Sequence, residues 1–72
     1  MSLLPLIMAK EGDKVLIKRI SGKDDVRQHL AELGFVVDAE VLVVSAASGN
    51  LIVQVKGSRV ALDRSMASRI FI

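Results

Sequence analysis

Short runs in which aliphatic residues alternate with polar ones dominate the second half of this 72-residue chain. Residues 51–56 alternate in this way, and Gly57-Ser58 is predicted to form a two-residue hairpin turn into a further run at residues 59–62. Successive side chains of a strand point to opposite faces of a sheet, so alternation of this kind predicts strands. The two runs are therefore expected to pair as antiparallel neighbours.

Three other segments carry a similar signal. Residues 14–20 are rich in β-branched side chains, residues 41–45 form a second run, and residues 70–72 form a last short one. Residues 48–50 read Ser-Gly-Asn and are predicted to turn the chain between the second and third strands. Together with the hairpin, these segments predict about five antiparallel strands.

The residue pattern changes at about residues 25–33, where one short helix is predicted. Asp25 and Gln28 have the spacing of a capping box, in which the carboxylate accepts a backbone N–H and the glutamine reaches back. Gly34 suits the position just after a helix, where the backbone turns left-handed. Apolar residues at i, i+4 and i+7 form one stripe: Val26, Leu30 and Leu33.

The order of these elements predicts a mainly β fold in a single domain, residues 1–72. Asp63 is placed to cap a final helical turn before the last strand. Only 3% of residues are aromatic, so the core is expected to be aliphatic. Short strands with tight turns predict a small barrel, because closing the sheet removes edges that would otherwise aggregate.

Composition excludes several kinds of chemistry. The chain has no cysteine, which removes disulfides and thiolate nucleophiles and makes the cytoplasm the default location. Its single histidine and the adjacent acids Asp24-Asp25 do not supply a nucleophile with a base, so no enzymatic activity is expected. The apolar residues 3–9 are too few to span a membrane, so membrane association is expected only through a partner.

One set of side chains has the chemistry of a metal site. Asp25, His29 and Glu32 are spaced i, i+4 and i+7, so a helix would project all three within one sector. Imidazole and carboxylate ligands suit ferrous iron. The same spacing is also what any exposed helix face shows, and no cofactor is expected.

A basic balance raises the alternative of nucleic-acid binding. The net charge is +2 and the sequence pI is about 9.4. Small barrels that bind RNA or single strands stack bases on aromatic rings, but Phe35 and Phe71 are the only aromatic residues and both are expected in the core. A small RNA- or ribosome-associated barrel therefore remains the second hypothesis, and no nucleic acid is expected as the main partner.

Several motifs in order resemble one known family. They are Ile20-Ser21-Gly22, the Leu-Ala-Glu-Leu-Gly-Phe segment at residues 30–35, and the Val-Ala-Leu to Arg-Ile segment at residues 60–70. This arrangement resembles the ferrous iron transport protein A (FeoA) family over nearly the whole chain. The family commonly has Pro-Gly where this sequence has Val37-Asp38, which suggests a positive φ at Asp38.

The resemblance implies a fold, a place and a partner. It implies an SH3-like barrel in the bacterial cytoplasm that supports a membrane ferrous iron transporter. The soluble part of that transporter carries a GTPase domain. The expected role is to bind and modulate this GTPase-bearing part without catalysing a reaction.

A candidate docking surface follows from the strand pattern. Leu42, Val44 and Ile52 fall on the opposite side of their strands from Val41 and Val43, so one of the two sets needs cover outside the core. The cover is either the helix, the segment at residues 3–9, or a partner. We expect this patch, with Arg27 as a basic rim, to contribute to docking or to self-association.

Overall fold

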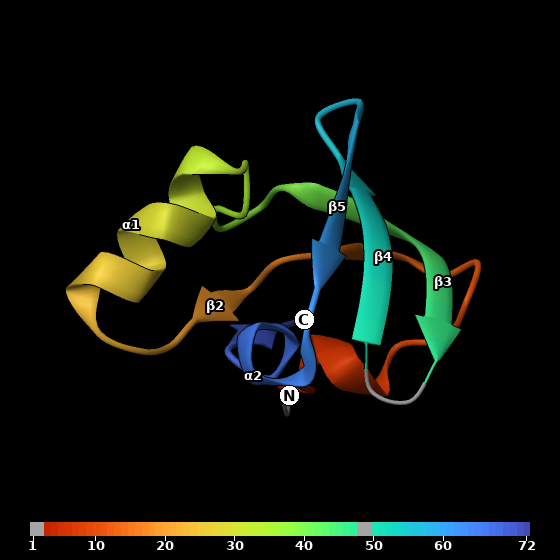
Figure 1. The fold of residues 1–72 in the computed structure, drawn as a ribbon, viewed down its shortest axis with the longest axis horizontal. Coiled ribbons are helices and arrows are strands. Elements are labelled where there is room, and N and C mark those ends of the chain that lie inside the picture. The colour runs from red at the N-terminus through yellow and green to blue at the C-terminus, as the bar shows by residue number, and fades with distance from the viewer. Residues whose placement is uncertain (1–2, 48–49) are drawn as a thin grey trace.

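The computed structural model describes residues 3–47 and 50–72, and β-strands dominate this part of the chain (Figure 1). Its extents are 29 × 28 × 22 Å. The elements in chain order are the 3-10 helix η1 (Leu6–Met8), β1 (Lys14–Leu16), β2 (Arg19–Ile20), α1 (Asp24–Glu32), β3 (Glu40–Ala47), β4 (Asn50–Val55), β5 (Ser58–Leu62), α2 (Arg64–Ala67) and β6 (Ile70–Phe71).

The described residues form six strands in two sheets rather than the five expected. One sheet has four strands in the order β1-β3-β4-β5, and the other pairs β2 with β6. All pairs are antiparallel, as predicted. The predicted first strand is split into β1 and β2, and the strands do not close into one hydrogen-bonded ring. The mainly β architecture is confirmed, but the expected closure of the barrel is wrong.

The β4–β5 hairpin turns one residue earlier than predicted. Val55 pairs with Ser58, so the two turn residues are Lys56 and Gly57 rather than Gly57 and Ser58. Their φ angles are 50° and 78°, and two positive values in a two-residue loop are the mark of a type I′ turn. The turn between β3 and β4 was predicted at residues 48–50; residues 48–49 lie outside the described residues, and Asn50 already begins β4.

The start of α1 differs from the predicted capping box. The N-cap is Lys23, and its side chain makes no capping hydrogen bond. The Asp25 carboxylate instead accepts a hydrogen bond from the N–H of the next residue, Val26, at 2.9 Å. The capping-box prediction was wrong because Asp25 already lies inside the first turn, where it still complements the positive end of the helix dipole.

The end of α1 is confirmed and fixes the largest core side chain. Gly34 has φ 107°, and its N–H donates to the Ala31 carbonyl at 3.0 Å. The Phe35 N–H donates to the Leu30 carbonyl at 2.9 Å. These two bonds make a Schellman motif, which usually brings an apolar contact between the residues that its longer bond joins. Phe35 and Leu30 are both fully buried, so this local turn delivers an aromatic ring to the core.

The core is one aliphatic cluster with a single aromatic ring. No polar or charged residue is buried within the described part of the chain. The stripe predicted on α1 is only partly internal, since Leu30 is buried, Val26 is half-buried and Leu33 is 37% exposed. The buried residues are Leu6, Ile17, Leu30, Phe35, Val41, Val43, Leu51, Val53, Val55, Leu62, Ala67 and Ile70.

The two ends of the described chain lie against each other. The Leu4 N–H donates to the Ile72 carbonyl at 3.0 Å, and the Ile72 N–H donates back to Leu4 at 2.7 Å. Pro5 bridges to Phe71, and Leu6 of η1 enters the core. No helix in the described residues is long and apolar enough to cross a membrane.

Asp38 adopts the backbone conformation expected from the family comparison. Its φ is 73°, and its N–H donates to the Ile17 carbonyl at 2.7 Å. Asp tolerates the left-handed region better than most residues because its short side chain can bond locally. The turn between α1 and β3 is therefore retained without glycine.

The predicted cap of the final helical turn is confirmed and gives a first test. The Asp63 carboxylate accepts the Met66 N–H at 2.8 Å at the start of α2. We expect Asp63→Ala to lower the free energy of unfolding by about 1 kcal/mol, because a backbone N–H loses its partner. Urea denaturation followed by circular dichroism measures this, and Asp63→Asn, which keeps a capping oxygen, should lose far less. Equal losses for both variants would contradict a capping role.

Candidate functional site

The outer face of the four-stranded sheet carries the predicted aliphatic patch. Cross-strand partners share a face, and the pairing aligns Leu42 with Lys14 on one side and Gln54 on the other. Ile52 aligns with Ala61 of β5. Leu42 is half-buried and Ile52 is 42% exposed, whereas their strand neighbours Val41, Val43, Leu51 and Val53 fill the core. The strand alternation predicted from the sequence therefore holds for Leu42 and Ile52.

Val44 departs from this alternation. The register of β3 against β4 shifts between Val43 and Ser45, so that Ser45 rather than Val44 stands opposite Ile52. An extra residue of this kind is a β-bulge, which bends the strand and increases its twist. Val44 is half-buried and has no cross-strand partner in the register. We therefore define the outer patch by Leu42 and Ile52, with Val44 at its bulged margin.

Basic residues flank the outer patch. Lys14, Leu42, Gln54 and Arg59 form one row across the four strands. A shallow hollow of about 450 Å³ opens beside this row, and its lining residues are Lys14, Ala39, Glu40, Leu42, Gln54, Lys56 and Gly57. Neither η1 nor α1 covers the outer patch, since η1 packs against α2 and α1 lies at the other end of the molecule (Figure 1). This face therefore offers aliphatic contact with a margin in which basic residues outnumber the one acid, Glu40.

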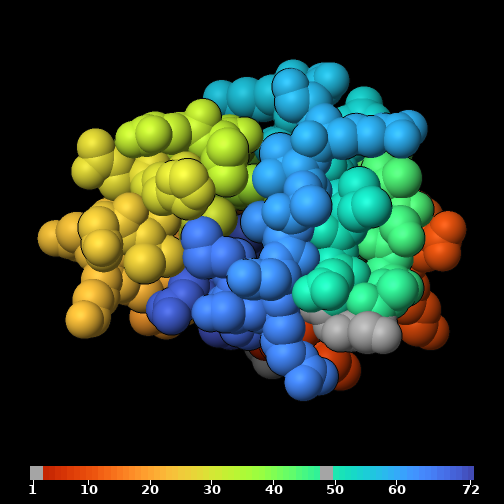
Figure 2. Space-filling view, in the orientation of Figure 1, coloured from red at the N-terminus to blue at the C-terminus, as the bar shows by residue number. Residues whose placement is uncertain are grey.

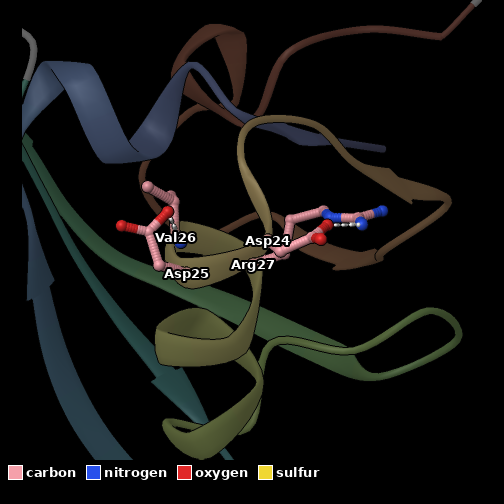
Figure 3. A network of polar contacts seen from close by, with 4 residues as sticks. All are labelled: Asp24, Asp25, Val26 and Arg27. Carbon is pink, nitrogen blue, oxygen red and sulfur yellow. Dashed lines mark hydrogen bonds and ion pairs between the residues drawn. The ribbon is translucent and has the colours of Figure 1, made fainter.

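Arg27 does not form the rim of the outer patch. It lies on α1, far from β3 and β4 in Figure 1, and its guanidinium pairs with the Asp24 carboxylate at 2.5 Å (Figure 3). The Arg27 and Asp24 side chains are 52% and 94% exposed, so this pair contributes little to stability. The prediction that Arg27 borders the patch was wrong in its geometry, because α1 lies away from β3 and β4 in Figure 1. Lys14, Lys56 and Arg59 take that place.

The predicted metal ligands all lie on α1 and are exposed. Asp25, His29 and Glu32 project from the helix, and one Asp25 oxygen already accepts the Val26 N–H (Figure 3). Among the described residues, no three histidine or acidic side chains come close enough together to hold a metal ion. The three residues therefore have the sequence spacing of metal ligands on a helix, but they do not form a coordination site.

The chain matches one family of known proteins over nearly its whole length. The family model described as the FeoA domain matches residues 4–72. This chain belongs to the FeoA family. The match confirms the resemblance inferred from the ordered motifs.

Relatives of this FeoA chain have been found in sequence and in structure. A protein of Methanocaldococcus jannaschii with the provisional name Fe(2+) transport protein A is 32% identical over 68 residues, which span 94% of this chain and 83% of the relative. The crystal structure of an iron uptake regulatory protein (FeoA) superposes with a TM-score of 0.90 at 28% identity, covering 97% and 95% of the two chains.

A third relative bears on the fold class. The FeoA of Stenotrophomonas maltophilia, solved with zinc and described as a procaryotic SH3 domain protein, superposes with a TM-score of 0.80 at 30% identity. The match covers 93% of this chain and 86% of that one. The expected SH3-like class is confirmed by this agreement.

Metal titration of this FeoA chain tests the trio on α1. We expect no saturable heat when Fe²⁺ or Mn²⁺ is added under anaerobic conditions, because Asp25, His29 and Glu32 are solvated and not gathered around one point. Isothermal titration calorimetry measures this, with His29→Ala as the matched variant. Saturable heat that disappears in His29→Ala would show that the trio does bind metal.

The basic flank of the outer patch was missed from the sequence. Alternation alone places Lys14 on the outward face of its strand, and the hairpin register places Arg59 outward too. The signal was therefore present, but the cross-strand alignment that gathers Lys14, Leu42 and Arg59 into one row required the structure.

Proposed function

We propose that this chain is a non-enzymatic accessory protein of ferrous iron uptake that acts in the cytoplasm. It binds and modulates the GTPase-bearing part of a membrane Fe(II) transporter through the outer patch. Membership of the FeoA family supports the connection with iron transport, and a solved relative is described in terms of ferrous iron transport activation. The chain itself reaches the membrane only through this partner.

The observation that carries the proposal is the row across the four-stranded sheet. Leu42 and Ile52 lie on the solvent side of strands whose other side is already filled by core residues, so these two side chains are not needed to build the core. Lys14 and Arg59 flank them and are exposed. Protein interfaces typically combine an apolar centre with a polar rim, and this face has both.

A pull-down at moderate salt, with the purified chain as bait and mass spectrometry as readout, tests the proposed role. The proposal predicts recovery of a membrane iron transporter that carries a GTPase domain. Recovery of RNA or ribosomal proteins alone would favour the second hypothesis of an RNA-associated barrel. A gel shift with RNA separates the two further, because phosphate contacts weaken steeply with salt whereas a largely apolar protein interface does not.

A further inference from the structure

The two edges of the four-stranded sheet are formed by β1 and β5. β5 is the last strand in the order β1-β3-β4-β5, so only one of its sides is paired. Figure 2 shows the outward face of this strand, in light blue, on the front of the molecule. Ser58, Arg59 and Ala61 are exposed, while Val60 is half-buried and Leu62 is buried. An open edge of this kind can pair with a strand from another chain.

Hairpin geometry identifies which backbone groups face outward. In a two-residue hairpin the residues next to the turn, here Val55 and Ser58, exchange hydrogen bonds, and bonded and non-bonded pairs then alternate. Arg59 and Ala61 therefore stand in non-bonded pairs with β4, and their N–H and C=O groups point away from it. Within the described chain these groups make no backbone hydrogen bond to another element. The edge thus offers two donors and two acceptors.

The side chains at the same positions specify what could pair there. Arg59 and Ala61 both point to the outer face, where Arg59 continues the row from Leu42 and Ala61 lies beside Ile52. Within residues 3–47 and 50–72 the one ion pair joins Arg27 to Asp24, so Arg59 is not engaged by a carboxylate of the described chain. One residue of an added strand would lie opposite the cation Arg59. The residue two positions away would lie opposite the small side chain of Ala61, with the aliphatic Ile52 next to it.

We propose that the open edge of β5 accepts an extended strand of a partner protein, with an acidic side chain opposite Arg59 and an aliphatic side chain opposite Ala61. The added strand runs antiparallel to β5, so it reads aliphatic, any residue, acidic in chain order. Its backbone supplies the affinity and its two outward side chains supply the selectivity, as in other cases of strand addition. The inference rests on the proposed function, since it names the shape and chemistry of the segment that docks.

Charge favours this occupant over a second copy of the chain. Two β5 strands paired antiparallel through Arg59 and Ala61 would place both Arg59 side chains on one face as diagonal neighbours, where like charges repel. Lys56, in the adjacent turn, adds to the positive field. Charged side chains on an edge strand are a common device against self-pairing, whereas an acidic strand is attracted.

The first test uses a blocked peptide, Thr-Thr-Val-Thr-Asp-Thr-Thr, added to the full ¹⁵N-labelled chain. Saturable shifts of the backbone amides of residues 58–62 are expected. Methylating the peptide nitrogen of Asp or Val, which faces β5, should weaken binding about tenfold, whereas methylating that of the central Thr should leave it nearly unchanged. Equal effects of all three methylations, or shifts that do not involve β5, would overturn the proposal.

Substitutions in β5 itself test the same edge. Arg59→Glu should weaken the peptide about tenfold and should reverse its preference toward the peptide with Lys in place of Asp. Ala61→Pro removes an outward N–H but no bond to β4, so it should abolish binding while Ala61→Thr retains it. Circular dichroism confirms that each variant is folded. Unchanged peptide affinity in Arg59→Glu or in folded Ala61→Pro would overturn the proposal, as would self-association through β5 in sedimentation.

Binding of the wild-type chain and its variants to the soluble region of the transporter distinguishes this inference from the proposed function. If the wild-type chain binds that region and folded Ala61→Pro binds it equally well, the edge proposal fails while the accessory role stands. If the wild-type chain does not bind the region at all, the accessory role fails. Loss of binding in Ala61→Pro together with retention in Ala61→Thr is the result that supports the edge.

Discussion

Replacing Phe35 with alanine is expected to lower the free energy of unfolding by about 3–5 kcal/mol. Phe35 is fully buried and is the largest side chain in the core, which otherwise contains only aliphatic residues. A domain of 72 residues has a total stability of only about 4–11 kcal/mol, so much of the population should unfold near body temperature. Thermal unfolding followed by circular dichroism measures the loss, which corresponds to at least about 12 °C in Tm.

Phe35→Leu is the matched control for this prediction. Leucine keeps most of the volume and all of the apolar character, so it should lose only about 1 kcal/mol. Phe71→Ala adds a second comparison, since Phe71 is only half-buried and should lose less than Phe35→Ala. Similar losses at Phe35 and Phe71 would contradict the view that the ring delivered by the Schellman motif organises the core.

Ile52→Asp is expected to weaken binding of the transporter's GTPase-bearing region by at least about 30-fold. Ile52 is 42% exposed on the outer patch, and a carboxylate there would have to be desolvated in a complex. The fold should survive, with a stability change of about 1 kcal/mol, because the side chain does not enter the core. Titration calorimetry of the purified variant measures the affinity, and circular dichroism confirms the fold.

Val37→Asp is the matched control for the outer patch. Val37 is an aliphatic residue with 56% exposure, and it lies after α1 rather than on β3 or β4. The same change of charge at this position should leave binding within about twofold, as is usual for residues outside an interface. If Val37→Asp abolishes binding and Ile52→Asp does not, docking takes place beside α1 and the outer patch has another role.

Sequence reasoning succeeded where a local motif decides the structure. Gly34 ends α1 in a positive-φ conformation, and Asp63 caps α2, because each outcome depends on residues within one turn of chain. The positive φ of Asp38 was also readable, from the place at which the family commonly has glycine. Phe35 and Phe71 were both expected in the core because they are large and apolar; Phe35 is fully buried, but Phe71 is only half-buried.

Sequence reasoning failed where pairing between distant strands decides the structure. The bulge at Val44 leaves no mark in an alternating pattern, because the extra residue is itself aliphatic. The hairpin turn lies one residue earlier than predicted because Lys56 adopts a positive φ, which is not expected of a lysine from its sequence alone. Closure of the barrel was inferred from the need to protect edges, but the edge of β5 is left open and carries Arg59 instead.

The candidate site was predictable only in part for the same reason. Leu42 and Ile52 follow from the alternation of single strands, which is a local pattern. The position of α1 relative to the sheet is a matter of packing, so Arg27 was assigned to the wrong end of the molecule. Spacing on a helix also overstated the metal trio, since three residues in one sector need not converge on one point.

The most direct test of the accessory role is a calorimetric titration of the purified chain into the soluble GTPase-bearing region of a ferrous iron transporter, repeated at low and high salt. The account predicts saturable binding that persists at high salt, because uncharged contacts, including aliphatic contact at the outer patch, outweigh the basic rim. Absence of binding at low salt, where the charges of Lys14 and Arg59 are least screened, would contradict it.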